Sequence, residues 1–227
     1  MTGATGNVYC GLHEFADMAF VLHFLRASDL FVDVGANIGS YTVLASKVCG
    51  ARSIALEPDP GNMAFMQRNI AINMLENRVR TIEAALGTLS TMGKFTVGFD
   101  TMNRIAKPGD KQIRDVRIIR LDDVLADQNP ILIKLDVEGF EAEVLAGGQE
   151  TLAKPSLLAI ETECSEPGVV SQLTAAGFEE AFYDPFTHSL SPTPVWHQNN
   201  ALYVRDREAC KARLATARPI QILHKFL

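Results

Sequence analysis

Short apolar runs recur along the chain, separated by stretches in which apolar residues return every three or four positions. Buried parallel strands are almost uninterrupted apolar runs, because helices cover both faces of their sheet. Helical patterns lie between the first three runs, so we expect a doubly wound α/β domain with a mostly parallel sheet. The runs predict strands over residues 30–34, 52–57, 78–86, 131–136, 157–163 and 201–205.

The best-defined helical pattern follows the second apolar run. Asp59 is placed to cap this helix, and Pro60 suits its first position, because proline lacks the N–H that a helix start leaves unpaired. Another helix is expected over about residues 12–26, ahead of the first strand. The apolar stripe of the helix after Pro60 is predicted to consist of Met63, Met66, Ile70 and Met74.

The other segments are expected to extend this one domain, which spans residues 1–227. Residues 1–28 are expected to form an N-terminal helical segment. Residues 88–119 hold two strand-like stretches joined by a long polar segment, which predicts a hairpin or an active-site flap. Residues 206–227 are expected to form a C-terminal helix and an apolar tail, which docks on the domain or on a second copy in a homodimer.

Composition narrows the expected partners and location. The chain has 21 Lys and Arg against 27 Asp and Glu, so its net charge of −6 offers no excess positive field to nucleic acid. No apolar segment reaches the roughly 20 residues of a membrane span, and the first residues do not form a secretory signal. Four scattered cysteines show no zinc-ligand spacing. We therefore expect a reduced, cytoplasmic protein without a nucleic-acid partner.

The stretch FVDVGANIGSYTVLAS, residues 31–46, carries the clearest chemistry. A glycine turn between a strand and a helix lets backbone N–H groups approach a ligand. The dinucleotide fingerprint G-x-G-x-x-G is incomplete, because Asn37 and Ser40 replace its second and third glycines, which disfavours nicotinamide and flavin cofactors. S-adenosylmethionine fits better: Asp33 suits its ammonium group, and Glu57, ending the next strand, suits its ribose hydroxyls.

Several blocks together resemble the FkbM family of methyltransferases that use S-adenosylmethionine. The resemblance spans about residues 12–205, and D-V-E-G-F-E with the downstream V-L-x-G-G is its most distinctive part. It implies a Rossmann-like class I methyltransferase fold, whose seven-stranded sheet has an antiparallel last strand. It also implies O-methylation of a small-molecule hydroxyl, on a sugar or a natural-product intermediate. The blocks are FVDVGANIGSYTVLAS, ALEPDPGNMAFMQRNIAIN, RLDDVL, ILIKLDVEGFEAEVLAGG and NNALYV.

The resemblance also assigns cofactor-binding residues, position by position. It makes Glu57 the ribose acid, places Glu83 and Ala84 beside the adenine, and places Glu14, ahead of the first strand, near the cofactor. The full set that it implies is Glu14, Asp33, Gly35, Asn37, Gly39, Glu57, Glu83 and Ala84.

The strand over residues 131–136 ends on Asp136, at the edge of the sheet where ligands of open α/β folds bind. Methyl transfer to a hydroxyl requires alignment of the two reactants and removal of the hydroxyl proton. Asp136 or Glu138 is therefore a candidate catalytic base that takes this proton directly.

Two other chemistries stay open for the same proton. Asp136 with Glu161 or Glu163 could hold a hard cation such as Mg²⁺, which lowers the pKa of the hydroxyl. His188 or His197 could instead act as the base, because the pKa of histidine suits neutral pH. Two other functions also stay open: an NAD(P)-dependent oxidoreductase with an atypical glycine loop, and a binding module that keeps the cofactor pocket without transfer.

Overall fold

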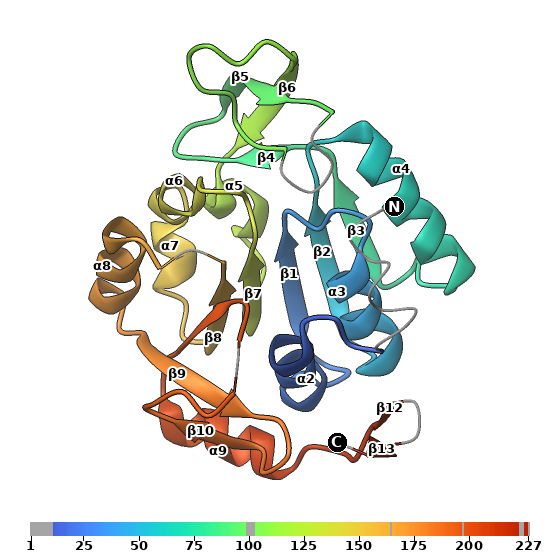
Figure 1. Cartoon of the computed structure of the whole chain (residues 1–227), viewed down its shortest axis with the longest axis vertical. Helices are drawn as coiled ribbons and strands as arrows, with labels where there is room; N and C mark the ends of the chain where they lie inside the picture. Colours follow the sequence, from blue (N-terminus) through green and yellow to red (C-terminus); the bar gives the residue numbers. More distant parts are fainter. Residues whose placement is uncertain (1–10, 99–102, 164, 197, 223–224, 227) are drawn as a thin grey trace.

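The structure is a computed structural model, and it describes residues 11–98, 103–163, 165–196, 198–222 and 225–226. A twisted central sheet crosses the molecule, with helices on both faces and a smaller sheet above one edge (Figure 1). The central sheet contains eight strands in the order β10-β9-β11-β8-β7-β1-β2-β3. These strands are β1 (Leu30–Val34), β2 (Arg52–Leu56), β3 (Val79–Ile82), β7 (Leu132–Leu135), β8 (Ala159–Thr162), β9 (Glu179–Asp184), β10 (Ser189–Ser191) and β11 (Ala201–Val204).

The pairing confirms the expected mostly parallel sheet. Strands β3, β2, β1, β7 and β8 pair in parallel, whereas β11 is antiparallel to both β8 and β9. The sheet has eight strands where seven were expected, because β10 folds back on β9 in an antiparallel hairpin. The hairpin turn is stabilised by Asp184, whose carboxylate accepts the backbone N–H groups of Phe186 and Thr187.

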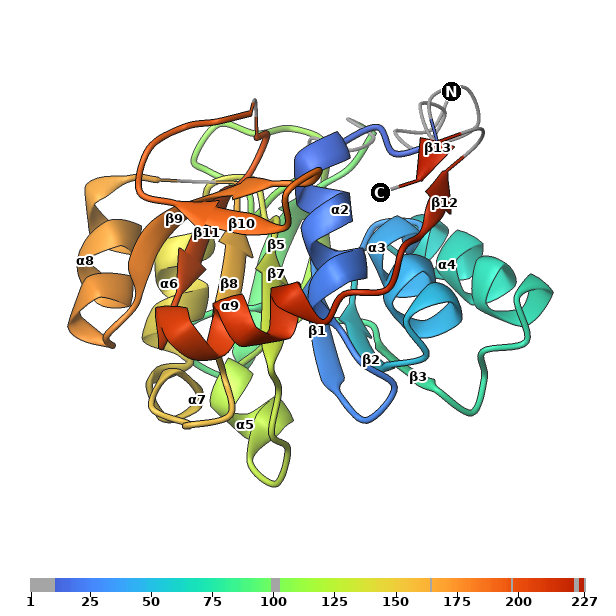
Figure 2. The same cartoon turned by 90° about the horizontal axis from the view of Figure 1, so that it is seen from below.

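Alternate residues of the central strands pack into two different cores. Phe31 and Leu132 face the core that contains α2 and α9, whereas Val32 and Ile133 face the core that contains α5 to α8. Figure 2 shows α2 and α9 on the near side of the strands. The helices within the described residues are α2 (Phe15–Phe24), α3 (Ser40–Val43), the π-helical turn η1 (Leu44–Val48), α4 (Pro60–Ile72), α5 (Leu121–Leu125), α6 (Glu141–Ala146), α7 (Gln149–Leu152), α8 (Pro167–Ala175) and α9 (Arg207–Ala215).

Helix α4 starts as the sequence predicts and ends earlier than its apolar stripe. The Asp59 carboxylate accepts the backbone N–H groups of Gly61 and Asn62, at 2.8 and 3.1 Å. Met63, Met66 and Ile70 are buried against the sheet, as expected. Met74 is 78% exposed, because the helix ends at Ile72 and Met74 adopts a positive φ of 58° that turns its side chain outward.

The apolar run over residues 78–86 forms two strands instead of one. It breaks after β3, where the N–H of Ala84 turns back to the carbonyl of Ile82, at 3.1 Å. The second part, β4 (Ala85–Leu86), joins a separate three-stranded sheet in the order β4-β6-β5. Strands β5 (Thr91–Thr96) and β6 (Ile113–Ile119) are antiparallel, which confirms the hairpin expected within residues 88–119.

One helix precedes the central sheet in the sequence, and another follows it. Helix α2 lies within the expected N-terminal helical segment, and α9 is the expected C-terminal helix, capped by Asp206 through the N–H of Ala209 at 3.0 Å. The tail forms a two-stranded sheet of β12 (Gln221–Ile222) and β13 (Lys225–Phe226). Among the described residues, no helix is long and apolar enough to cross a membrane.

Candidate active site

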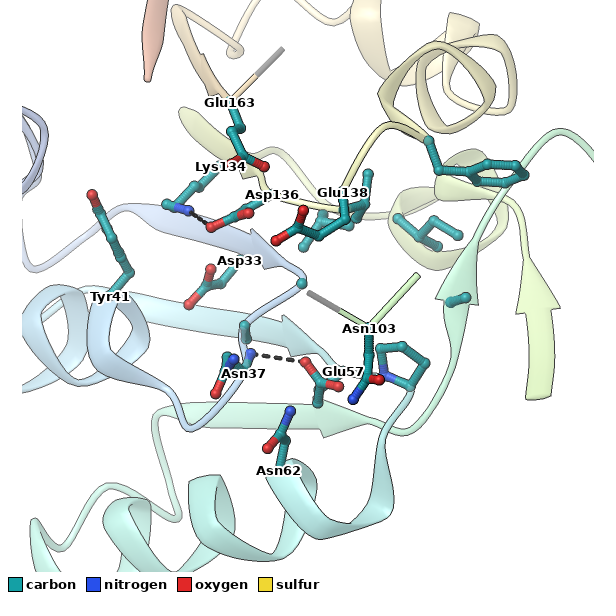
Figure 3. Close-up of a pocket in the computed structure, with 18 of the residues that line it drawn as sticks. Asp33, Asn37, Tyr41, Glu57, Asn62, Asn103, Lys134, Asp136, Glu138 and Glu163 are labelled. Atoms are coloured by element: carbon teal, nitrogen blue, oxygen red, sulfur yellow. Dashed lines mark hydrogen bonds and ion pairs between the residues drawn. The ribbon is translucent and has the colours of Figure 1, made fainter. Parts of the chain in front are cut away.

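A cavity of about 340 Å³ opens where the parallel strands end. Its walls are the turns after β1, β2 and β7 (Figure 3). Phe95 of β5 and Ile105, which forms an isolated bridge with it, also line the cavity. Carboxyl ends of parallel strands meet at one edge, which is why residues far apart in the sequence converge there. The predicted site residues that line this cavity are Glu14, Asp33, Gly35, Asn37, Glu57, Ala84, Asp136, Glu138 and Glu163.

The glycine loop brings the turn after β1 into backbone contact with the turn after β7. Gly35 has a φ of +78°, and a Cβ atom there would lie 1.8 Å from the backbone oxygen of Asp136. Gly39 does not line the cavity; its φ of +85° shapes the loop, and a Cβ atom would lie 2.9 Å from the Cγ of Met66. Both glycines are therefore required by the loop geometry, and Gly35 sets how closely the two turns approach.

The carboxylate of Glu57 is held by backbone N–H groups from two turns at the cavity. Its two carboxylate oxygens accept the N–H of Asn37 at 2.9 Å and the N–H of Asp59 at 2.8 Å. Burial raises the pKa of Glu57 to about 7, although these two hydrogen bonds oppose the rise. A carboxylate held in this way can still accept hydrogen bonds from a diol in the cavity, since each oxygen has two lone pairs.

Asp33 belongs to a row of charged side chains that runs across the sheet. It is paired with Lys134 on β7, which in turn is paired with Glu161 on β8, so the three side chains share one face. Asp33 is only 2% exposed, and its carboxylate accepts the hydroxyl of Thr42 at 2.6 Å. Burial raises the pKa of Asp33, and the Lys134 charge works against that rise.

Lys134 and Tyr41 line the cavity and were not among the predicted site residues. The Nζ atom of Lys134 lies 2.5 Å from a carboxylate oxygen of Asp136 and 4.6 Å from the centre of the Tyr41 ring. Burial alone would lower the pKa of Lys134, but Asp136 and Asp33 raise it, so the side chain stays charged. The signal was present in the sequence, because a lysine inside the apolar run ILIKLD is buried only when it is paired.

Three carboxylates gather above Lys134 at the mouth of the cavity. Oxygen atoms of Asp136, Glu138 and Glu163 all lie within 4.8 Å of one another. Burial, followed by the neighbouring charges of Asp136 and Glu138, raises the pKa of Glu163 to about 7. Glu138 has a φ of +54°, which is unusual for a residue with a side chain, and the turn holds it toward the cavity. A cluster of three carboxylates of this kind can accept a proton.

Other expected site residues lie elsewhere. Glu161 is 1% exposed and does not line the cavity. It lies within β8, whereas Glu163 follows the last residue of that strand. Its carboxylate oxygens have no hydrogen-bond partner among the described residues. Glu83 is exposed and does not line the cavity, although its neighbour Ala84 does. Of the two carboxylates expected beside Asp136, Glu163 lies there and Glu161 does not, and the place of Glu83 beside a ligand is corrected.

Of the two candidate histidines, His188 is the one within the described residues, and it does not lie at the cavity. The ring of His188 packs against His23 with ring centres 4.1 Å apart, at the turn between β9 and β10, and it does not line the cavity. His197 lies outside the described residues. The carboxylates around Asp136 thus remain the candidate bases that the cavity brings together.

Comparison with known proteins adds an independent line of evidence. Residues 33–179 match the model of the methyltransferase FkbM domain. The chain is 28% identical over 172 residues to methyltransferase sdnD of Sordaria araneosa, and 26% identical over 172 residues to 31-O-demethyl-FK506 methyltransferase FkbM of Streptomyces tacrolimicus. Each alignment covers 60% of this chain and 66% of the relative, slightly under two thirds of its length.

Solved structures agree on the fold. A methyltransferase FkbM from Methylobacillus flagellatus superposes with a TM-score of 0.57 at 17% identity, over 82% of this chain and 47% of that one. A putative rRNA methylase from Clostridium thermocellum superposes with a TM-score of 0.51 at 10% identity, over 83% and 90% of the two chains. The fold is that of the class I methyltransferases that use S-adenosylmethionine. Together with the domain match over residues 33–179, this establishes that the chain belongs to the FkbM methyltransferase family.

Proposed function

We propose that this protein uses S-adenosylmethionine to methylate a hydroxyl group of a small molecule, such as a sugar or a natural-product intermediate. Family membership supports methyl transfer and disfavours the NAD(P)-dependent alternative. The name of the relative from Streptomyces tacrolimicus describes an O-methyltransferase, which fits the same reaction. The observation that carries the proposal is that Asp33, Glu57 and Asp136, from three strand ends, line one cavity.

The cavity residues fit the chemical groups of S-adenosylmethionine. Glu57 is placed to accept hydrogen bonds from the ribose diol, and Asp33 offers a carboxylate to the ammonium group. The apolar side chains of Leu86, Phe95 and Ile105 form a wall suited to the adenine. When bound, this cofactor supplies an electrophilic methyl group on a positively charged sulfur.

Asp136 is the base that we propose for the acceptor hydroxyl. It lies at the strand end nearest Glu138 and Glu163, and the Lys134 ammonium holds one of its oxygens at 2.5 Å. That ion pair engages one oxygen and leaves the other to take the hydroxyl proton as the methyl group moves from sulfur to the acceptor oxygen. The same ion pair disfavours Mg²⁺ on Asp136, because the Lys134 ammonium already contacts this carboxylate; of the two other expected ligands, Glu163 lies beside Asp136 and Glu161 lies outside the cavity.

The proposal is tested by replacing Asp136 with asparagine. We expect Asp136→Asn to bind S-adenosylhomocysteine within a few fold of the original protein, while transfer of labelled methyl groups to hydroxylated sugars and natural products falls about 10²–10⁴-fold. The exposed Asp127→Asn is the matched control and should transfer normally. A chelator should leave transfer unchanged.

Three outcomes would contradict the proposal. The absence of heat on titration with S-adenosylhomocysteine would remove the cofactor assignment. Full transfer by Asp136→Asn would remove the base assignment. Cofactor binding with no transfer to any hydroxylated acceptor would favour a binding module that has lost catalysis.

A further inference from the structure

One cation lies in a cavity whose other charged side chains are acids. Of the described residues that line the cavity, Lys134 is the only lysine or arginine. Its ammonium group is buried at the base of the site, where a cation has to be paired. The acidic lining residues are Glu14, Asp33, Glu57, Asp136, Glu138 and Glu163.

The order of side chains along the cavity shows which end of the proposed cofactor Lys134 would meet. In Figure 3, Glu57 lies on one side of Asp33, and Lys134 and Tyr41 lie on the other side. S-adenosylmethionine is a linear arrangement of ribose, sulfur and amino acid. With its ribose at Glu57 and its ammonium at Asp33, the amino-acid end therefore reaches the side of the cavity that Lys134 occupies.

Lys134 has hydrogen-bonding capacity beyond the contact that it makes. An ammonium group carries three N–H donors. Among the described residues, Asp136 accepts one of them, and the face of the Tyr41 ring lies 4.6 Å from the nitrogen. Two donors thus remain for a ligand, and an anion is the partner that a desolvated ammonium binds most strongly.

We propose that Lys134 binds the α-carboxylate of S-adenosylmethionine, while the neighbouring Asp33 binds the α-ammonium group. This inference rests on the proposed function and adds the group that recognises the amino-acid end of the cofactor. The two side chains are paired across β1 and β7, so they present opposite charges side by side. A ligand that carries both an ammonium and a carboxylate group can pair with both side chains, whereas an amine without a carboxylate can pair only with Asp33.

The test compares S-adenosylhomocysteine with its decarboxylated analogue, which keeps the adenosine, the sulfur and the amino group. By calorimetry, the original protein should bind the analogue at least about tenfold more weakly, as expected for a lost charge-assisted hydrogen bond. Lys134→Met should weaken S-adenosylhomocysteine by a similar factor. It should leave the analogue unchanged or tighter, because the acids near residue 134 then attract the amino group without a competing cation.

Controls separate this role from a general effect of removing charge. Lys94→Met removes an exposed lysine on β5 and should leave both affinities unchanged. If Lys134→Met does not fold, as judged by circular dichroism, Lys134→Arg retains the charge and should retain the preference for S-adenosylhomocysteine.

Two results overturn the inference. One is equal affinity of the original protein for the two ligands; the other is an equal loss of both in Lys134→Met, which would mean that Lys134 only orients Asp136. Failure of the original protein to bind S-adenosylhomocysteine at all would instead overturn the proposed function.

Discussion

At the scale of single residues, Glu57 combines a structural role with the one proposed for binding. Its two oxygens hold the backbone of the turns after β1 and β2, through the N–H groups of Asn37 and Asp59. The same side chain is 5% exposed, and burial raises its pKa to about 7. The protein therefore holds a carboxylate whose charge changes near neutral pH at the point where a ribose is expected.

This pKa predicts that cofactor affinity depends on pH. The ribose hydroxyls donate to the ionised form, so binding is favoured above about pH 7 and is lost as the pH falls and Glu57 takes up a proton. Near pH 6, about one unit lower, the affinity for S-adenosylhomocysteine should be roughly tenfold weaker than its plateau near pH 8. Calorimetry across this range measures the effect.

Glu57→Gln is the control for this pH dependence. A neutral amide does not titrate, so the variant should bind weakly at every pH and show a much flatter profile. Asp59 is the nearest charged neighbour that raises the pKa of Glu57, and it remains in the variant. The same steep profile in both proteins would assign the titration to another group.

Much of the site could be predicted from the residue types in the sequence, but not the residues that reach the cavity through the packing of the fold. Asp33, Glu57 and Asp136 could be placed because each follows a buried run, at the edge where ligands bind. Tyr41 was missed, since whether a helical side chain faces the cavity depends on how α3 packs, and Lys134 was missed although a lysine within an apolar run signals a paired cation. Glu161 was misplaced because it is buried within β8, whereas Glu163, just past the end of the same strand, lines the cavity.

At the scale of elements, the site depends on the contact between two turns. The turn after β1 meets the turn after β7, where Gly35 leaves no room for a side chain beside the carbonyl of Asp136. The proposed ligand for the ammonium group and the proposed base are therefore held at a fixed spacing by backbone atoms. This explains the glycine of the D-V-G sequence at the end of β1.

Gly35→Ala tests this contact. A Cβ atom 1.8 Å from the Asp136 oxygen forces the turns apart, and a side chain at a φ of +78° adds at least about 1–2 kcal/mol of backbone strain. We expect a lower free energy of unfolding in urea and loss of measurable S-adenosylhomocysteine binding. Gly109→Ala is the matched control: its φ is +101° and no atom lies within 4 Å of the added Cβ, so it should show only the backbone penalty. Equal effects of the two substitutions would remove the role assigned to the contact.

Elements were predicted from the sequence wherever burial alone fixes the pattern. The parallel strands were found because both of their faces are covered, which leaves uninterrupted apolar runs. Strand β9 was missed because it begins with two exposed glutamates and only two of its six residues are buried. Residues 78–86 were read as one strand because only Glu83 and Ala84 separate the two strands that they form, and neither glycine nor proline marks the break.

At the scale of the whole molecule, the cavity is formed by segments that span most of the chain. Glu14 comes from the start of α2 and Glu163 from the end of β8, while Phe95 comes from β5 and Ile105 from the loop that bridges to it. Folding of the entire sheet is needed before these side chains face one another. A ligand that contacts all of them consequently binds the folded state and has little to bind in the unfolded chain.

This linkage predicts a thermal shift. S-adenosylhomocysteine at about one hundred times its dissociation constant should stabilise the folded state by about 2.7 kcal/mol, which raises the Tm of a chain of this size by roughly 5–10 °C. NADH at the same concentration should leave the Tm unchanged, because its pyrophosphate would face Asp33 and Glu57 without the glycines that let a dinucleotide loop approach it. The shift should also disappear in Glu57→Ala, since that variant lacks the acceptor for the ribose hydroxyls. Stabilisation by NADH alone would instead mean that the cavity recognises a dinucleotide and that this chain has departed from the cofactor of its family.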